Sequence, residues 1–122
     1  MFLPDSEVRP CIDRVSAAFP RFDDWQYVNE DDLDYTGFTL WGEFVLDSKK
    51  PRSRHYYITI HTCKTMWVGH LSIGKHCYFW SSADFGDAYL VDTENCATLD
   101  EAIASLKNRI ANLFAAFSGS AG

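Results

Sequence analysis

The last quarter of the chain carries an apolar stripe with helical spacing, and this feature constrains the fold most strongly. The members of the stripe recur every three or four residues and are Leu99, Ile103, Leu106, Ile110, Leu113 and Phe117. Thr98 and Glu101 form a capping-box pair at the start, because the threonine accepts a backbone hydrogen bond and the glutamate reaches back. We predict a helix over residues 98–117, a disordered tail at 118–122, and an apolar surface on which the stripe packs.

A second helix is predicted near the N-terminus, over residues 6–19. Its apolar side chains recur at spacings of four, three and four residues and are Val8, Ile12, Val15 and Phe19. Pro10 suits a helix only near its first turn, which leaves the first helical residue open. Pro20 ends the helix.

Between these helices the chain is typical of β-strands separated by turns. Alternating apolar side chains and a wealth of Tyr, Ile and Thr suit a pleated sheet. Strands are predicted at residues 38–46, 54–62, 66–73, 76–82 and 88–92, with a short one near Trp25 and Val28. The elements together predict a single α+β domain over residues 1–117. Its sheet is five- to six-stranded and mainly antiparallel, with an N-terminal and a C-terminal helix packed on one face.

Tight turns would set the pairing of the central strands. A two-residue turn at Lys64-Thr65 places Ile60 opposite Gly69, and a second at Gly74-Lys75 adds the next strand. The face toward the C-terminal helix then carries Ile58, Ile60, Trp67, Leu71, Ile73, Tyr78 and Trp80. Gly69 would leave room there for Trp80 or for the helix backbone. The opposite face carries Tyr57, His61, Cys63, Met66, Val68, His70, Cys77 and Phe79.

Composition excludes several classes of protein. The 122 residues are 47% hydrophobic, which excludes a disordered chain, and are too few for a two-domain enzyme. The formal net charge of −6 argues against direct binding to nucleic acid, which needs clustered Lys and Arg. No secretory signal and no apolar run of about 18 residues is present. We therefore expect a cytoplasmic protein without membrane contact, with its four cysteines as reduced, buried thiols.

The negative charge is concentrated in one segment. No basic residue occurs between Arg21 and Lys49. The interval holds eight acids, Asp23, Asp24, Glu30, Asp31, Asp32, Asp34, Glu43 and Asp47. Such a stretch favours either a solvated face that aids solubility or a docking surface for a basic partner. Trp25, Tyr27, Tyr35 and Trp41 lie among the acids, and Tyr and Trp commonly anchor interfaces.

We interpret residues 23–47 as a docking surface for a basic protein partner. The expected contact residues are Asp23, Asp24, Trp25, Tyr27, Glu30, Asp31, Asp32, Asp34 and Tyr35. Small acidic domains of this kind suit inhibitors of nucleic-acid-binding proteins, such as immunity proteins, DNA mimics and antidefence inhibitors. No catalytic or phosphate-binding motif is present, so we expect a non-enzymatic protein without a cofactor. The sequence leaves homo-oligomerisation open.

Two alternative sites stay open. The sheet face that bears His61, Cys63, His70 and Cys77 could bind a small ligand or a metal, or serve a small enzyme, although the spacing matches no zinc motif. Residues 32–43 resemble the loop of an EF-hand calcium site, with Asp32, Asp34, Thr36, Gly37 and Glu43 at positions one, three, five, six and twelve. This resemblance implies calcium binding, but Thr39 replaces the usual aliphatic residue at position eight.

Overall fold

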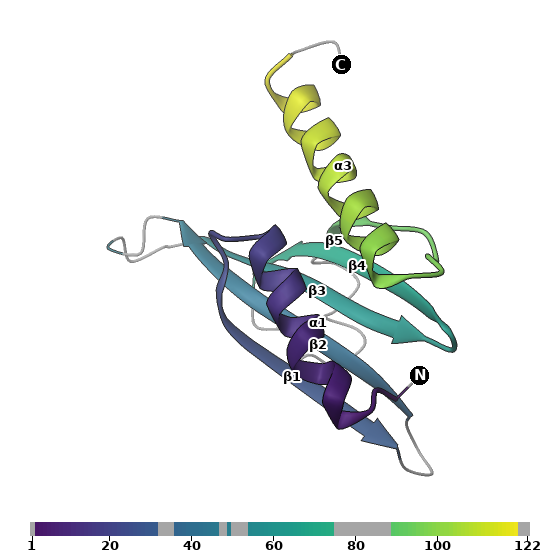
Figure 1. Ribbon diagram of the computed structural model, residues 1–122. Helices are drawn as coiled ribbons and strands as arrows, with labels where there is room; N and C mark the ends of the chain where they lie inside the picture. Colours follow the sequence, from purple (N-terminus) through teal and green to yellow (C-terminus); the bar gives the residue numbers. More distant parts are fainter. Residues whose placement is uncertain (1, 32–35, 47–48, 50–53, 75–88, 120–122) are drawn as a thin grey trace.

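In the part of the chain that the structure describes, five strands form one antiparallel sheet and follow one another across it in chain order (Figure 1). The computed structural model describes residues 2–31, 36–46, 49, 54–74 and 89–119. The strands are β1 (Asp23–Asp31), β2 (Thr36–Leu46), β3 (Arg54–Cys63), β4 (Met66–Ile73) and β5 (Tyr89–Asp92). The predicted strands in these regions are confirmed, and β1 is longer than expected. The strand predicted at residues 76–82 lies outside the described residues.

Two helices, α1 (Asp5–Ala18) and α3 (Leu99–Phe117), lie on the same face of the sheet (Figure 1). α1 contacts β1 and α3, while α3 contacts β4 and β5. The second half of α3 extends past the sheet (Figure 1). The predicted α+β architecture, with both helices on one face, is confirmed. Neither described helix is both long and apolar enough to cross a membrane.

The helix ends follow the local sequence signals. The Thr98 hydroxyl accepts a hydrogen bond from the Glu101 backbone N–H at 3.1 Å, and the Glu101 carboxylate accepts one from the Ala97 backbone N–H at 3.2 Å. The predicted capping pair is therefore confirmed. In α1, Pro10 lies at the sixth position, beyond the first turn where we expected it. Proline has no backbone N–H, so the carbonyl of Ser6 receives no helical hydrogen bond from this position. Ser6 is exposed to solvent.

The core lies between the helices and the inner face of the sheet. Its fully buried side chains include Val15, Phe38, Leu40, Ile58, Ile60 and Leu106. The predicted register of β3 and β4 is confirmed, because Ile60 pairs with Gly69 and Leu71 is buried on the same face. The predicted pairing of residues 76–82 with β4 is wrong, because the other edge of β4 pairs with β5, where Leu71 lies opposite Val91. The space at Gly69 is taken by the side chains of Ile60 and Leu106, where an added methyl group would meet atoms at 3.0 and 3.1 Å. A helix side chain, rather than the helix backbone, uses this space.

The opposite face of the sheet is also largely buried. Buried side chains on this face include Trp41, Tyr57, Thr59, Val68, His70 and Ser72. Trp41 is 2% exposed, so the expectation that it belongs to an exposed acidic and aromatic surface is wrong. Its place in β2 explains this, since alternate residues of a strand point to opposite faces and this one points to a buried face.

Candidate functional site

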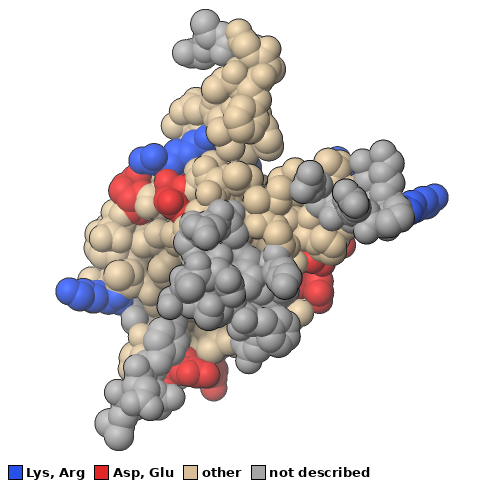
Figure 2. Space-filling model, turned by 180° about the vertical axis from the view of Figure 1, so that it is seen from behind, with Lys and Arg blue, Asp and Glu red and all other residues tan. Residues whose placement is uncertain are grey.

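The structure divides the predicted acidic docking surface into two pairs of carboxylates. Asp23 and Asp24 lie at the start of β1, Glu30 and Asp31 lie at its end, and all four are exposed. At about 3.3 Å per residue, the two pairs are roughly 20 Å apart along the strand. Seen from behind, the acidic side chains lie in separate groups (Figure 2). The predicted contact residues Asp32, Asp34 and Tyr35 lie outside the described residues.

The aromatic residues of β1 point toward the helical side of the sheet. The Trp25 ring is half-buried over Gly42, and its indole N–H donates a hydrogen bond to the Phe22 carbonyl at 3.2 Å. Tyr27 stacks on Phe38, with ring centroids 5.9 Å apart, yet 48% of it stays exposed. Of these two predicted contact residues, Tyr27 presents more surface to a partner, while Trp25 is held within the fold.

The EF-hand-like pattern does not form a loop in the part that the structure describes. Thr36 and Glu43, the fifth and twelfth positions, belong to the extended strand β2, roughly 23 Å apart at about 3.3 Å per residue. An extended strand cannot wrap an ion. The Glu43 carboxylate instead accepts a hydrogen bond from the Tyr57 hydroxyl at 2.8 Å and lies 2.9 Å from His55 Nδ1. The calcium-loop expectation is therefore wrong for residues 36–43.

A hydrogen-bonded chain links two histidines and a carboxylate on the outer face of the sheet. His70 Nδ1 lies 2.7 Å from Asp92 Oδ1, and His70 Nε2 lies 2.8 Å from His61 Nε2. The Tyr89 ring stacks on His70, with centroids 4.4 Å apart. The prediction that His61, Cys63 and His70 share a face agrees with the register, while Cys77 lies outside the described residues. Across the described part of the chain, no three His, Cys, Asp or Glu residues converge as metal ligands.

The geometry of this hydrogen-bonded chain favours one arrangement of donors and acceptors between the two histidines. His70 can donate from Nε2 to His61, whose Nε2 then accepts, and His70 Nδ1 lies within hydrogen-bond distance of Asp92. His61 Nδ1 lies 3.3 Å from the Thr62 carbonyl and can donate to it. Burial and the neighbouring His70 charge lower the pKa of His61 below its usual value near 6.5. The pair therefore resists taking up a second proton.

A pH dependence of stability follows from this lowered pKa. The unfolded chain protonates His61 near pH 6.5 and the folded chain only at lower pH, so the free energy of unfolding falls as the pH drops below about 6.5. We expect His61→Gln, which keeps a hydrogen-bonding side chain, to lose less stability than the wild type between pH 7.5 and pH 5.5. Urea denaturation at both pH values measures this difference. Equal losses in the two proteins would contradict the lowered pKa.

An apolar groove lies where α3 leaves the sheet. Its volume is about 580 Å³, and its walls include Phe19, Phe22, Phe44, Tyr56, Ile110 and Phe114. The exposed cations Arg21 and Lys107 line it as well. Phe114 and Phe117 remain 59% and 73% exposed on the part of α3 beyond the sheet. The periodicity of residues 98–117 identified the helical stripe, but nothing local indicated that its last member, Phe117, would stay uncovered.

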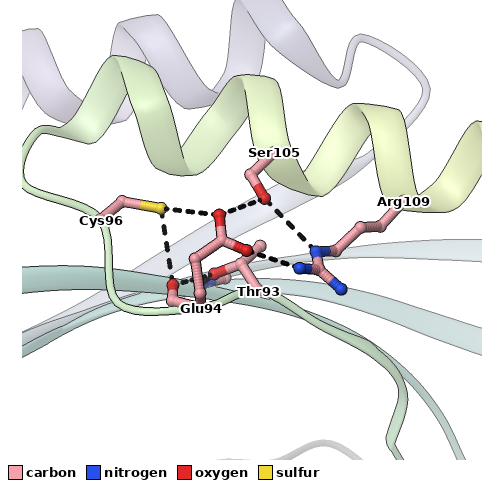
Figure 3. Close-up of polar contacts among 6 residues, drawn as sticks. Thr93, Glu94, Cys96, Ser105 and Arg109 are labelled. Atoms are coloured by element: carbon pink, nitrogen blue, oxygen red, sulfur yellow. Dashed lines mark hydrogen bonds and ion pairs between the residues drawn. The ribbon is translucent and has the colours of Figure 1, made fainter.

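A polar cluster ties the segment before α3 to that helix (Figure 3). The Glu94 carboxylate accepts hydrogen bonds from Ser105 Oγ at 2.8 Å and from Arg109 Nη2 at 2.6 Å. Hydrogen bonds from its own backbone N–H, from Ser105 and from Arg109 lower the pKa of Glu94 to about 2. The sequence did not indicate this cluster, because Ser105 and Arg109 lie 11 and 15 residues from Glu94 and follow no motif.

The described cysteines differ in exposure. Cys11 and Cys96 are buried, as expected for small apolar side chains, whereas Cys63 is exposed. Burial raises the pKa of the Cys11 thiol to about 11, which keeps it protonated and unreactive at neutral pH. The expectation of buried cysteines is wrong for Cys63, because the last residue of β3 lies at the end of the strand beside a turn. Cys77 lies outside the described residues.

Comparison with models of known protein families, with curated protein sequences and with solved structures finds no match to this chain.

Proposed function

We propose that the protein acts by binding a basic protein partner and that strand β1 is the docking edge. One observation carries this proposal. Among the described strands, β1 pairs only with β2, so its other edge offers unpaired backbone groups. The strand carries exposed carboxylates at both ends and contains no Lys or Arg. None of its residues is buried, in contrast to the central strands.

An extended segment of the partner can add to β1 as a further strand, with backbone hydrogen bonds supplying affinity. Lys and Arg side chains of that segment would meet Asp23 and Asp24 at one end and Glu30 and Asp31 at the other. Opposite charges of this kind accelerate association and select the partner more than they add affinity.

Tyr27 supplies the anchor in the middle of this edge. It lines a hollow of about 500 Å³ between β1 and α1, together with the apolar Phe2, Val8 and Ile12 and the polar Asp5, Arg9 and Asn29. An aromatic ring with an exposed side and a hollow beside it offers a partner side chain a place to become buried. The edge thus combines an exposed aromatic ring at its centre with acidic ends.

The partner class that we propose is a protein that itself binds nucleic acid. Such proteins carry clustered Lys and Arg to neutralise phosphates, and an acidic edge can occupy that surface. The protein would then act as an inhibitor, of the immunity, DNA-mimic or antidefence type. This inference rests on charge and on the free edge of β1.

Capture experiments with matched variants test the proposal. The edge variant carries Asp23→Asn, Asp24→Asn, Glu30→Gln and Asp31→Asn. The control variant makes the same charge change at exposed acids of the helices, with Glu7→Gln, Asp13→Asn, Asp100→Asn and Glu101→Gln. We expect the immobilised wild type and the control to retain a basic protein from a lysate of the native host. The edge variant and 0.5 M salt should each release it, and retention by the edge variant would refute the proposal.

A second candidate function is proton transfer on a bound ligand at the outer face. The chain from Asp92 through His70 to His61 favours it, because a carboxylate that orients an imidazole is a common acid–base arrangement. Calorimetric titration with a ligand, once found, should then lose its signal in His61→Ala while circular dichroism shows an intact fold. A retained signal would dismiss this candidate without touching the β1 proposal.

A further inference from the structure

We propose that the apolar groove between α3 and the sheet binds a long-chain carboxylate such as a fatty acid. This inference goes beyond the proposed docking edge, because the groove lies at the opposite end of the core from Tyr27 and shares no lining residue with the hollow there. The two proposals can therefore fail separately. The contacts of the groove, its charge and its size each support the assignment.

The walls of the groove come from elements far apart in the sequence. Phe19 and Phe22 follow α1, Phe44 belongs to β2, Tyr56 belongs to β3, and Ile110 belongs to α3. Phe22 and Phe44 pack with ring centroids 5.8 Å apart, and Phe44 and Tyr56 with centroids 6.3 Å apart. The protein thus presents a continuous aromatic and aliphatic lining to solvent, which favours an occupant with an apolar body.

The charge of the groove is opposite to that of the protein. Two cations and no carboxylate occur among its described lining residues, although the chain as a whole carries a formal charge of −6. The Arg21 guanidinium lies 5.7 Å from the centroid of the Phe44 ring, and the Lys107 ammonium lies 6.0 Å from that of Phe19. Both cations are therefore held over groove-wall rings, where they can pair with an anionic head group.

The size of the groove suits a small amphiphile. Its volume of about 580 Å³ falls within the roughly 300–1,000 Å³ of ordinary small-molecule sites. An apolar chain can lie along the aromatic wall while its carboxylate stays near Arg21 or Lys107 at the solvent side. This pairing of an apolar wall with cations selects a long-chain carboxylate over a neutral lipid.

Calorimetric titration with saturated carboxylates of 8, 10, 12 and 14 carbons, each below its micelle concentration, tests the proposal. Affinity should rise about fourfold for each added methylene group until the groove is filled, because each buried methylene contributes a fixed free energy. Dodecanol should bind roughly tenfold more weakly than dodecanoate, because it cannot pair with the cations. Absence of binding at every chain length would overturn the proposal.

Matched variants locate the binding in the groove. Arg21→Gln with Lys107→Gln should weaken dodecanoate binding about tenfold and leave dodecanol unchanged. The control, Lys49→Gln with Lys64→Gln, removes the same charge from exposed positions outside the groove lining and should change neither affinity. Ala111→Phe places a ring in the groove from the exposed side of α3 and should abolish binding of both ligands.

Other occupants of the groove give different results. If a second copy covers the groove, sedimentation velocity shows a dimer that Ala111→Phe dissociates, and carboxylates do not bind. If a helix of a protein partner covers it, Ala111→Phe releases a captured protein, and carboxylates again do not bind. Dodecanoate affinity that is equal in the wild type and Ala111→Phe places the ligand elsewhere. Each of these results contradicts the proposal.

Discussion

Replacing Leu106 with Ala is expected to lower the free energy of unfolding by about 2–5 kcal/mol. Leu106 is fully buried and packs where α3 meets β4, with its side chain against Gly69. Truncation removes apolar contacts and leaves a cavity that the sheet cannot close. Because small domains have total stabilities of only about 5–15 kcal/mol, the effect is large. Urea denaturation followed by circular dichroism measures it.

A double-mutant cycle assigns this effect to the contact between helix and sheet. Gly69→Ala alone should cost about 1–3 kcal/mol, since its methyl group would crowd Ile60 and Leu106. In the Leu106→Ala background the same methyl group enters the cavity and should cost less. Leu113→Ala, on the half-buried part of the same stripe, is the control with a smaller loss. Additive costs in the cycle would contradict the packing of Leu106 on Gly69.

Replacing Gly42 with Ala is the second large effect that we expect, with a loss of about 1–3 kcal/mol. A methyl group at Gly42 would lie 2.6–2.7 Å from three atoms of the Trp25 ring. An indole is rigid, so the whole ring must move, and its hydrogen bond to the Phe22 carbonyl would break. The start of β1 would be displaced with it. Urea denaturation of the variant measures the loss.

The control for Gly42→Ala replaces the ring that is crowded. In a Trp25→Leu background the flexible side chain can give way, so Gly42→Ala should cost clearly less there than in the wild type. An equal cost in both backgrounds would mean that Trp25 does not lie over Gly42. That result would also return Trp25 to the set of residues able to contact a partner.

The sequence predicted the elements whose signals are local. The capping pair and stripe fixed α3, and the turn at Lys64-Thr65 fixed the register that places Ile60 opposite Gly69. Gly69 in the predicted strand indicated that another group comes close to the sheet at this position. It did not indicate which group, because the distance between β4 and α3 depends on the whole fold. The room at Gly69 is used by Leu106.

Features that depend on distant residues could not be predicted. Glu43 matched a calcium-loop position by spacing, yet its partners His55 and Tyr57 come from the next strand. The acids of residues 23–47 looked like one surface, but an extended strand separates Asp24 from Glu30 by roughly 20 Å. The exposed end of α3 at Phe117 continues the periodicity of the buried part of the stripe. Only the extent of the sheet distinguishes them.

Hydrogen exchange in the complex with the captured partner tests the central claim most directly. If β1 is the docking edge, its outward-facing backbone amides from Asp23 to Asp31 exchange more slowly in the complex than in the free protein. Amides of α3 around Arg109 should exchange at the same rate in both states. Unchanged exchange along β1, with new protection elsewhere, would contradict the account.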